Sequence, residues 1–280
     1  MNRRQFVFAS LAAAGAAARR SAAAPLLEFG HRQANMEVPP GPGVFDLGKQ
    51  IGLNGVELQV FFKGTTLWDK DTLAGYKSAS ERTGLPVPSV AGIWPPGAGL
   101  PQPTAEEHIR KSIQVAEALH AKTILIACFD ANCPKMDEEK SYGPVVTLLA
   151  KVAGQAQDAG VVLAMETSNS PPEDKKLIDL VNRPSVRVYY DLFNVEHYKH
   201  TNEAVPGIAV LKNRIRQVHL KNEDKLLDER GPVDWAAAVK GLAAIDYRGW
   251  FVFETAHHSQ QEVVEATQKN IRFVRDHFAA

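Results

Sequence analysis

The chain has 280 residues, of which 45% are hydrophobic and 23% are charged, and its 32 basic side chains balance its 32 acidic ones. This composition is ordinary for a globular protein with a substantial core. The zero net charge argues against nucleic acid or an anionic membrane as a partner, because both select a basic surface. Neutrality suits a small substrate that carries little or no charge.

The first 24 residues have the zones of an export signal. A paired arginine, Arg3-Arg4, precedes a short apolar run over Phe8–Ala18 and a small-residue segment at 21–24. This order is typical of a signal peptide, and the arginine pair resembles the twin-arginine export signal, although Asn2 stands where Ser or Thr is usual. We therefore predict a signal peptide over 1–24, a mature domain over 25–280 and a periplasmic location.

A disordered N-terminus or a lipid-proximal anchor is the alternative interpretation of this segment. The apolar run is too short to span a bilayer, and no later segment of the sequence is long and apolar enough to do so. We therefore expect no stable membrane insertion after the signal is removed.

Two cysteines, Cys128 and Cys133, lie close together in the sequence. In an oxidising compartment they could pair across a short loop. Two cysteines are too few for a disulfide framework, so we favour a reduced, incidental pair.

Short apolar, β-branched runs bounded by turn residues alternate with longer amphipathic segments along the mature chain. Continuous apolar runs of this kind are typical of buried parallel strands. The predicted strands are Leu26–Gly30, Gly55–Phe61, Pro86–Ala91, Thr123–Cys128, Val161–Glu166, Arg187–Asp191, Gln217–Leu220 and Trp250–Glu254.

The amphipathic segments between the strands are predicted to be helices. In one of them Thr104 can cap the first turn, and apolar residues recur at helical spacing toward Leu119. Examples are Thr104–Leu119, Ala236–Leu242 and Val263–Phe278. A glycine that ends a helix belongs just before the next strand, and three glycines have that place: Gly84, Gly160 and Gly249.

Strict alternation of strands and helices predicts parallel pairing with crossover helices. Eight such units in roughly 255 residues match a closed (β/α)8 TIM barrel, in one domain, better than an open sheet. The stretch Ile93–Pro103 is rich in Pro and Gly and suits a rigid loop at the mouth of the barrel.

Enzymes with this fold place their catalytic groups at the carboxyl ends of the strands. Four successive predicted strands each deliver one metal-competent side chain there: Glu166, Asp191, His219 and Glu254. Three carboxylates and one imidazole suit a divalent metal, with Mn²⁺ favoured and Mg²⁺, Co²⁺ or Zn²⁺ as alternatives.

Each of the four side chains also has an interpretation that needs no metal. Asp191 could cap a helix, and His219 alone could be a satisfied core histidine. Glu166 and Glu254 are harder to explain in this way, because a lone buried glutamate is costly unless it is paired or bound to a metal. The occurrence of all four in consecutive units favours the metal site.

Five motifs resemble the xylose isomerase-like barrel superfamily, which includes sugar phosphate isomerases and epimerases, ketose 3-epimerases, hydroxypyruvate isomerases and inosose dehydratases. The similarity extends over essentially the whole mature chain and is more specific for the superfamily than for a substrate. The motifs are Gly55-Val56-Glu57-Leu58-Gln59, Ala164-Met165-Glu166-Thr167, Tyr190-Asp191-Leu192-Phe193-Asn194, Val218-His219-Leu220-Lys221 and Phe253-Glu254.

The resemblance to ketose 3-epimerases implies that Glu166, Asp191, His219 and Glu254 bind the metal and that the two glutamates exchange protons with the substrate. One glutamate would remove a proton beside a carbonyl, giving an enediolate, and the other would return a proton on the opposite face. Two departures concern substrate binding. Asn194 stands where the family often has histidine, and Lys221 and Lys225 stand near the place of a usual arginine.

Further residues near strand ends are candidates for substrate contact. The pair His31-Arg32 lies just past the first strand, where a surface loop is the alternative, and Glu57 ends the second, where a salt bridge is the alternative. Trp94 and Phe129 could stack on a sugar ring or pack in the core. We interpret the remaining histidines of this region as solvated: His197, His200, His257 and His258.

The sequence therefore predicts a metal-dependent isomerase or epimerase of a sugar or keto-sugar, with a small carbohydrate as its substrate. A lyase or hydratase acting on 3-keto-glycosides or inososes is the alternative. An abasic-site endonuclease and a non-catalytic sugar-binding barrel are less favoured, because the charge is neutral and both glutamates are present. Formation of a homo-oligomer stays open at this stage.

Overall fold

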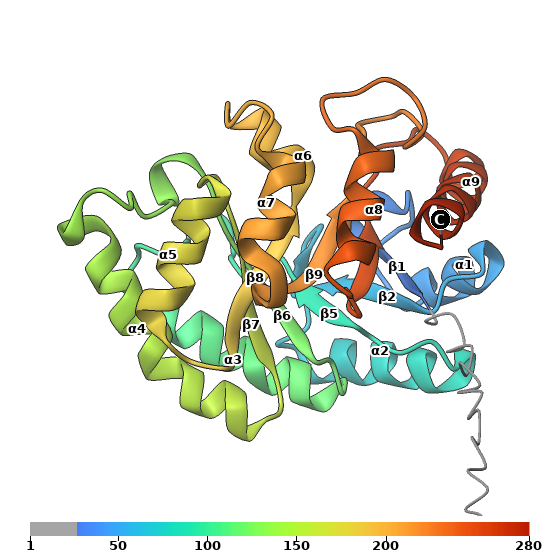
Figure 1. Cartoon of the computed structure of the whole chain (residues 1–280). Helices are drawn as coiled ribbons and strands as arrows, with labels where there is room; N and C mark the ends of the chain where they lie inside the picture. The colour runs from blue at the N-terminus through green and yellow to red at the C-terminus, as the bar shows by residue number, and fades with distance from the viewer. Residues whose placement is uncertain (1–26, 280) are drawn as a thin grey trace, which may run out of the picture.

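Eight parallel strands close into a barrel in the computed structural model, which describes residues 27–279 (Figure 1). The order around the barrel is β1-β10-β9-β8-β7-β6-β5-β2, and β1 closes the ring by pairing with both β10 and β2. The barrel strands are β1 (Glu28–Arg32), β2 (Gly55–Gln59), β5 (Ser89–Ala91), β6 (Thr123–Cys128), β7 (Val162–Thr167), β8 (Val186–Asp191), β9 (Ile215–Leu220) and β10 (Trp250–Phe253).

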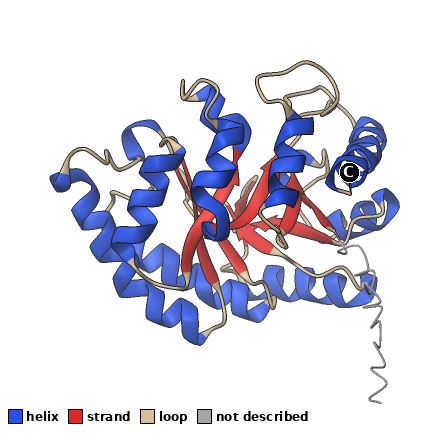
Figure 2. Cartoon of the chain, viewed as in Figure 1, coloured by secondary structure: helices blue, strands red, loops and turns tan. Residues whose placement is uncertain are grey.

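Helices surround the strands on the outside of the barrel, as Figure 2 shows. They are α1 (Val44–Ile51), α2 (Lys70–Thr83), α3 (Ala105–Ala118), α4 (Glu139–Asp158), α5 (Pro171–Val181), α6 (Leu192–His197), α7 (Ala204–Leu211), α8 (Trp235–Ala244) and α9 (Gln260–Phe278). Three short 3-10 helices are η1 (Gln33–Asn35), η2 (Asp130–Asn132) and η3 (Lys212–Arg214), and the strands β3 (Phe61–Phe62) and β4 (Thr65–Thr66) form a small hairpin. The predicted (β/α)8 barrel is thus confirmed.

Two apolar layers stabilise the barrel. The larger lies between the strands and the helices, and includes Phe29, Ile109 and Leu149. The smaller fills the interior with Ala91, Leu125, Ala164, Tyr189 and Val252. Successive side chains of a strand point to opposite faces, so each strand supplies both layers.

Several predicted boundaries were wrong by a few residues. The first strand runs to Arg32, so His31 lies within it and not beyond it. The third barrel strand begins at Ser89, after Pro86 and Pro88, because proline has no N–H to donate to a neighbouring strand. The second ends at Gln59, and the following residues turn into the β3–β4 hairpin.

The helix-end predictions were correct for two of the three glycines. Gly84 ends α2 with a positive φ of 69°, and Gly160, with φ 66°, follows Ala159, the C-cap residue of α4. Gly249 does not end α8, which is terminated at Ile245. A Cβ at Gly249 would lie 2.5 Å from the Arg216 carbonyl oxygen, so this glycine permits a close approach of two backbones. Thr104 precedes α3 but makes no side-chain cap.

The two cysteines and the helices can be compared with what the sequence predicted. Cys128 and Cys133 are free thiols whose Sγ atoms lie 4.0 Å apart. None of the helices formed by residues 27–279 is long and apolar enough to cross a membrane. The predicted signal peptide lies outside the described residues.

Candidate metal centre

The four predicted metal ligands meet at the carboxyl ends of β7 to β10. One potential ligand atom from each of Glu166, Asp191, His219 and Glu254 lies within 4.8 Å of the others. His219 Nδ1 is central to the group, because it lies 2.8 Å from Glu166 Oε1, 3.4 Å from Glu254 Oε2 and 3.9 Å from Asp191 Oδ2. The first three residues are buried and Glu254 is partly exposed.

The register of the strands explains why these side chains converge. Asp191 pairs with His219 across β8 and β9, and paired residues of parallel strands point to the same face. A register shift in β8 between Val188 and Tyr189 produces this alignment. Lys221 follows His219 by two residues. Its side chain therefore points into the barrel as well, closer to the mouth.

Asp191 combines the two roles that the sequence left open. Its Oδ1 accepts a hydrogen bond of 2.9 Å from the Asn194 backbone N–H and caps α6. Its Oδ2 is buried, makes no regular hydrogen bond to any described residue and lies 2.7 Å from Lys221 Nζ. Oδ2 is therefore an anionic oxygen that lies among the other potential metal ligands and has the Lys221 ammonium as its partner in this structure.

Two cations lie beside the cluster. Lys221 Nζ contacts Asp191 Oδ2 and, at 3.0 Å, Glu254 Oε2. Arg32 Nη1 pairs with Glu254 Oε1, and Arg32 Nε lies 3.9 Å from Glu57 Oε1. The sequence suggested only that Arg32 could contact substrate, and its pairing with Glu254 across β1 and β10 could not be derived from sequence spacing.

The carboxylates strongly perturb the titration of the buried histidine. Burial alone would lower the pKa of His219, but the Glu166 and Glu57 carboxylates raise it to about 9. Burial would raise the pKa of Glu166, whereas its charge interaction and hydrogen bond with His219 lower it to about 2. Burial raises the pKa of Asp191, and the Lys221 charge opposes this effect.

The charges of the site fit one divalent cation. When ionised, Glu57, Glu166, Asp191 and Glu254 carry four negative charges. Arg32 and Lys221 offset two of them. A neutral His219, which is the form that binds metals, therefore leaves a deficit of two positive charges. The oxygen-rich donor set and this deficit match a divalent ion.

The other residues predicted to contact substrate differ in how far they are buried and in whether they touch the cluster. Asn194 Nδ2 donates to Glu166 Oε1 at 3.4 Å, so it belongs to the cluster. Glu57 is fully buried beneath His219. Trp94 is half-buried and donates from Nε1 to the Ala127 carbonyl, which fastens its loop to β6. Phe129 stacks on Tyr198, with ring centroids 5.7 Å apart.

Two histidine interpretations need correction. His257, interpreted as solvated, is 9% exposed, and burial lowers its pKa. His200 is half-buried and its Nε2 lies 3.0 Å from the Ser168 carbonyl oxygen. The contact of His200 with Ser168, which is 32 residues away in the sequence, could not be derived from a short-range pattern. His197 and His258 are exposed as predicted.

His31 is fully buried in β1, with its Nε2 3.4 Å from Thr255 Oγ1. Burial lowers the pKa of His31 to about 4 from 6.5. Between these two pKa values the unfolded chain binds a proton on His31 and the folded protein does not. The free energy of unfolding present above pH 6.5 therefore decreases as the pH falls toward 4. The loss amounts to at most about 3 kcal/mol.

We predict that His31→Gln reduces the difference in unfolding free energy between pH 7 and pH 4.5 by about 2–3 kcal/mol relative to the wild type. Urea denaturation at the two pH values measures this difference. His258→Gln, at an exposed position, is the matched control and should leave it unchanged. Equal pH dependence in the wild type and His31→Gln would contradict the prediction.

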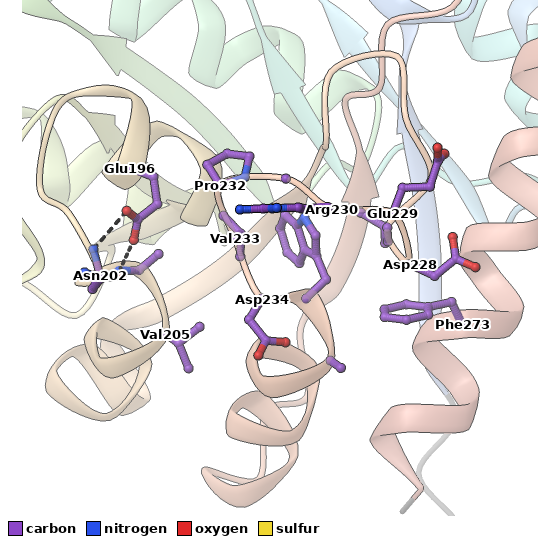
Figure 3. Close-up of a pocket in the computed structure, with 15 residues that line it drawn as sticks. Glu196, Asn202, Val205, Asp228, Glu229, Arg230, Pro232, Val233, Asp234 and Phe273 are labelled. Atoms are coloured by element: carbon purple, nitrogen blue, oxygen red, sulfur yellow. Dashed lines mark hydrogen bonds between the residues drawn. The ribbon is translucent and has the colours of Figure 1, made fainter.

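A separate pocket of about 610 Å³ lies outside the barrel wall. Figure 3 shows its charged side chains, among them Asp228, Arg230 and Asp234, which come from the segment leading into α8. Residues of α7 and Phe273 of α9 complete the lining. None of the residues predicted from the sequence to form the site lines this pocket.

Comparison with known proteins agrees with the fold of the chain. The family model described as "Xylose isomerase-like TIM barrel" matches residues 45–277. The chain belongs to this family. Its members share the closed barrel, and the match covers every strand that delivers a predicted metal ligand.

Curated relatives of the chain are sugar epimerases by name. The chain is 25% identical to the L-ribulose 3-epimerase of Methylomonas sp. (strain DH-1) over 162 residues, which cover 54% of this chain and 55% of that protein. The match thus spans about half the length of that relative. The chain is also 24% identical to the putative L-ribulose-5-phosphate 3-epimerase SgbU of Escherichia coli (strain K12) over 257 residues, covering 79% of this chain and 86% of the relative.

Solved structures show the same fold at lower sequence identity. The 3-keto-D-glucoside 4-epimerase of E. coli superposes with a TM-score of 0.74 at 15% identity, covering 90% of this chain and all of that one. A D-psicose 3-epimerase crystallised in the presence of D-fructose gives a TM-score of 0.74 at 14% identity, covering 91% and 100% of the two chains. At these identities the likeness concerns the fold alone.

Proposed function

We propose that the protein is a metal-dependent epimerase or isomerase of an unphosphorylated sugar or keto-sugar. The observation that carries this proposal is the group of three carboxylates and one imidazole at the ends of four consecutive strands. The sugar epimerases among its curated relatives support the same class of reaction.

The proposed ligands of the metal are Glu166, Asp191, His219 and Glu254. The donor set favours Mn²⁺, with Mg²⁺, Co²⁺ or Zn²⁺ as alternatives, because carboxylate oxygens dominate it. A divalent ion bound there would polarise a sugar carbonyl and so acidify the neighbouring C–H group.

The two glutamates are suited to move the proton. Glu166 Oε1 and Glu254 Oε2 approach His219 Nδ1 from different strands, so the two carboxylates border the same space. In the proposed reaction one glutamate removes the proton beside the carbonyl, which leaves an enediolate. The other returns a proton to the opposite face, which gives the epimer.

The side chains that contact Glu166 and Glu254 differ, and they suit different roles in the proposed reaction. Asn194 Nδ2 donates to Glu166 Oε1 and can orient it. Lys221 and Arg32 each pair with one oxygen of Glu254, and both side chains are partly exposed and can donate to substrate hydroxyl groups. Lys221 is a point charge, so it would not bind a substrate oxygen pair as a bidentate arginine does.

The charge balance supports a substrate without a phosphate group. One divalent ion neutralises the surplus of carboxylates over Arg32 and Lys221, so the site keeps no excess positive charge for a phosphate dianion. Export would agree with this choice of substrate. The proposed substrates are therefore free ketoses or keto-glycosides.

To test this proposal, Mn²⁺-loaded protein is incubated in deuterated water with a panel of free ketoses and 3-keto-glycosides. An epimerase is expected to introduce deuterium at the carbon beside the carbonyl in both epimers, because the abstracted proton exchanges with solvent. Release of a leaving group with formation of an unsaturated sugar would favour the lyase alternative. Absence of exchange with the whole panel, while Mn²⁺ stays bound, would contradict the proposed reaction.

We also propose that residues 1–24 direct export by the twin-arginine route and are then removed. Replacing Arg3 and Arg4 together by lysine should leave the protein in the cytoplasm, as measured by cell fractionation. The matched control replaces Arg19 and Arg20 by lysine and should still be exported. Normal export of the first variant would rule out this route.

A further inference from the structure

Glu57 is a fully buried carboxylate that lies beneath the metal centre, inside the barrel. It comes from β2, on the far side of the ring from β8 and β9. The sequence suggested a substrate contact for this residue. Its surroundings in the structure indicate a different role, because side chains from β5, β8 and β9 contact its two carboxylate oxygens.

The hydrogen-bond pattern around Glu57 is specific. Oε2 accepts from Ser89 Oγ at 2.6 Å and from Tyr189 OH at 2.7 Å. Gln217 Nε2 donates to Ser89 Oγ at 3.1 Å, so the single Ser89 hydroxyl hydrogen is free to point at Glu57. Two hydroxyl hydrogens therefore converge on Oε2, and Oε1 is left for another donor.

The nearest donor to Oε1 is the imidazole of His219, and Arg32 Nε lies farther from the same oxygen, at 3.9 Å. Nε2 of His219 lies 3.3 Å from Glu57 Oε1, and the opposite nitrogen, Nδ1, faces Glu166, Asp191 and Glu254. An acceptor at Oε1 requires a hydrogen on Nε2, and a neutral imidazole then has its lone pair on Nδ1. Both ring nitrogens face a carboxylate, so when Nδ1 gives up its hydrogen to bind a metal, Glu57 Oε1 accepts the hydrogen that stays on Nε2 and favours this tautomer.

The ring of His219 is also fixed in orientation. The Tyr189 ring packs against it with centroids 4.3 Å apart, and the Tyr189 hydroxyl is bound to the same Glu57 carboxylate. A flip of the imidazole would remove the nearest hydrogen-bond donor to Glu57 Oε1, which is costly for a buried charge.

We propose that Glu57 is a positioning residue: it selects the Nε2–H tautomer of His219 and presents Nδ1 to the divalent ion. This inference rests on the metal site of the proposed function. Hydrogen bonds from a carboxylate to a metal-bound histidine typically change metal affinity by about 10- to 100-fold. Glu57 therefore acts on metal binding through His219 and not by touching the substrate.

Two measurements on the full chain test the proposal. The first is the affinity for Co²⁺, titrated through its visible absorption, in the wild type, Glu57→Gln and Glu265→Gln. Glu265 is exposed on α9 and serves as the matched control. We expect Glu57→Gln to bind Co²⁺ about 10- to 100-fold more weakly and the control to bind as the wild type does.

The second measurement needs no substitution, so it can overturn the proposal even if Glu57→Gln fails to fold. Wild-type protein with ¹⁵N-labelled histidine and bound Mg²⁺ is studied by ¹H–¹⁵N correlation NMR. The proposal expects the ring hydrogen of His219 on Nε2. A hydrogen on Nδ1, or Co²⁺ affinity of folded Glu57→Gln within twofold of the wild type, overturns it. Absence of Co²⁺ binding to the wild type would overturn the proposed metal site itself, and this inference with it.

Discussion

Replacing Glu166 or Glu254 by glutamine is expected to lower turnover by about 100- to 10,000-fold, because each change removes a proton-exchanging base. Glutamine keeps one oxygen that can bind a metal, so much of the metal should be retained. Steady-state kinetics on the sugar identified by deuterium exchange measures the rate. Elemental analysis of the same samples measures the bound Mn²⁺.

A matched control separates chemistry from a general effect of the substitution. Glu139→Gln changes an exposed glutamate in the first turn of α4 and should leave turnover unchanged. The two-carboxylate mechanism would be wrong if both site variants turned over at the wild-type rate with Mn²⁺ bound. Loss of Mn²⁺ from one variant would instead mean that its glutamine cannot replace the carboxylate as a ligand.

Much of this site can be predicted from the sequence, because in a parallel barrel the positions of the strand ends in the sequence indicate which side chains lie together. The carboxyl ends of all strands of a parallel barrel meet at one rim. The last polar residue of each predicted strand is then a candidate neighbour of the others. Glu166, Asp191, His219 and Glu254 were found by this rule, and their ligand atoms do lie together.

Contacts across the interior of the barrel could not be predicted in the same way. Glu57 meets Tyr189 and His219 only because β2 lies across the ring from the neighbouring strands β8 and β9. The register shift between Val188 and Tyr189 aligns Asp191 with His219, and nothing in the local sequence marks it. Hydrophobic periodicity identifies strands but does not specify how far one strand slides against its neighbour.

Removal of the metal is expected to abolish turnover, and Mn²⁺ is expected to restore it. Without a divalent ion, the four carboxylates of Glu57, Glu166, Asp191 and Glu254 carry more charge than Arg32, Lys221 and a protonated His219 offset. A bound divalent ion is therefore expected to stabilise the folded state. A ligand present at 100 times its dissociation constant stabilises the folded protein by about 2.7 kcal/mol. For a chain of this size that corresponds to roughly 5–10 °C in Tm.

Asp191→Asn tests this effect without disturbing the helix that Asp191 caps. The asparagine side-chain oxygen can still accept the Asn194 N–H at the start of α6, but its NH₂ group, in the place of Oδ2, cannot bind a metal. The variant should therefore melt close to the metal-free wild type and gain little from Mn²⁺. Differential scanning calorimetry with and without Mn²⁺ measures both quantities. An equal rise in Tm for the variant and the wild type would place the ion elsewhere, because Asp191 Oδ2 would then contribute nothing to its binding.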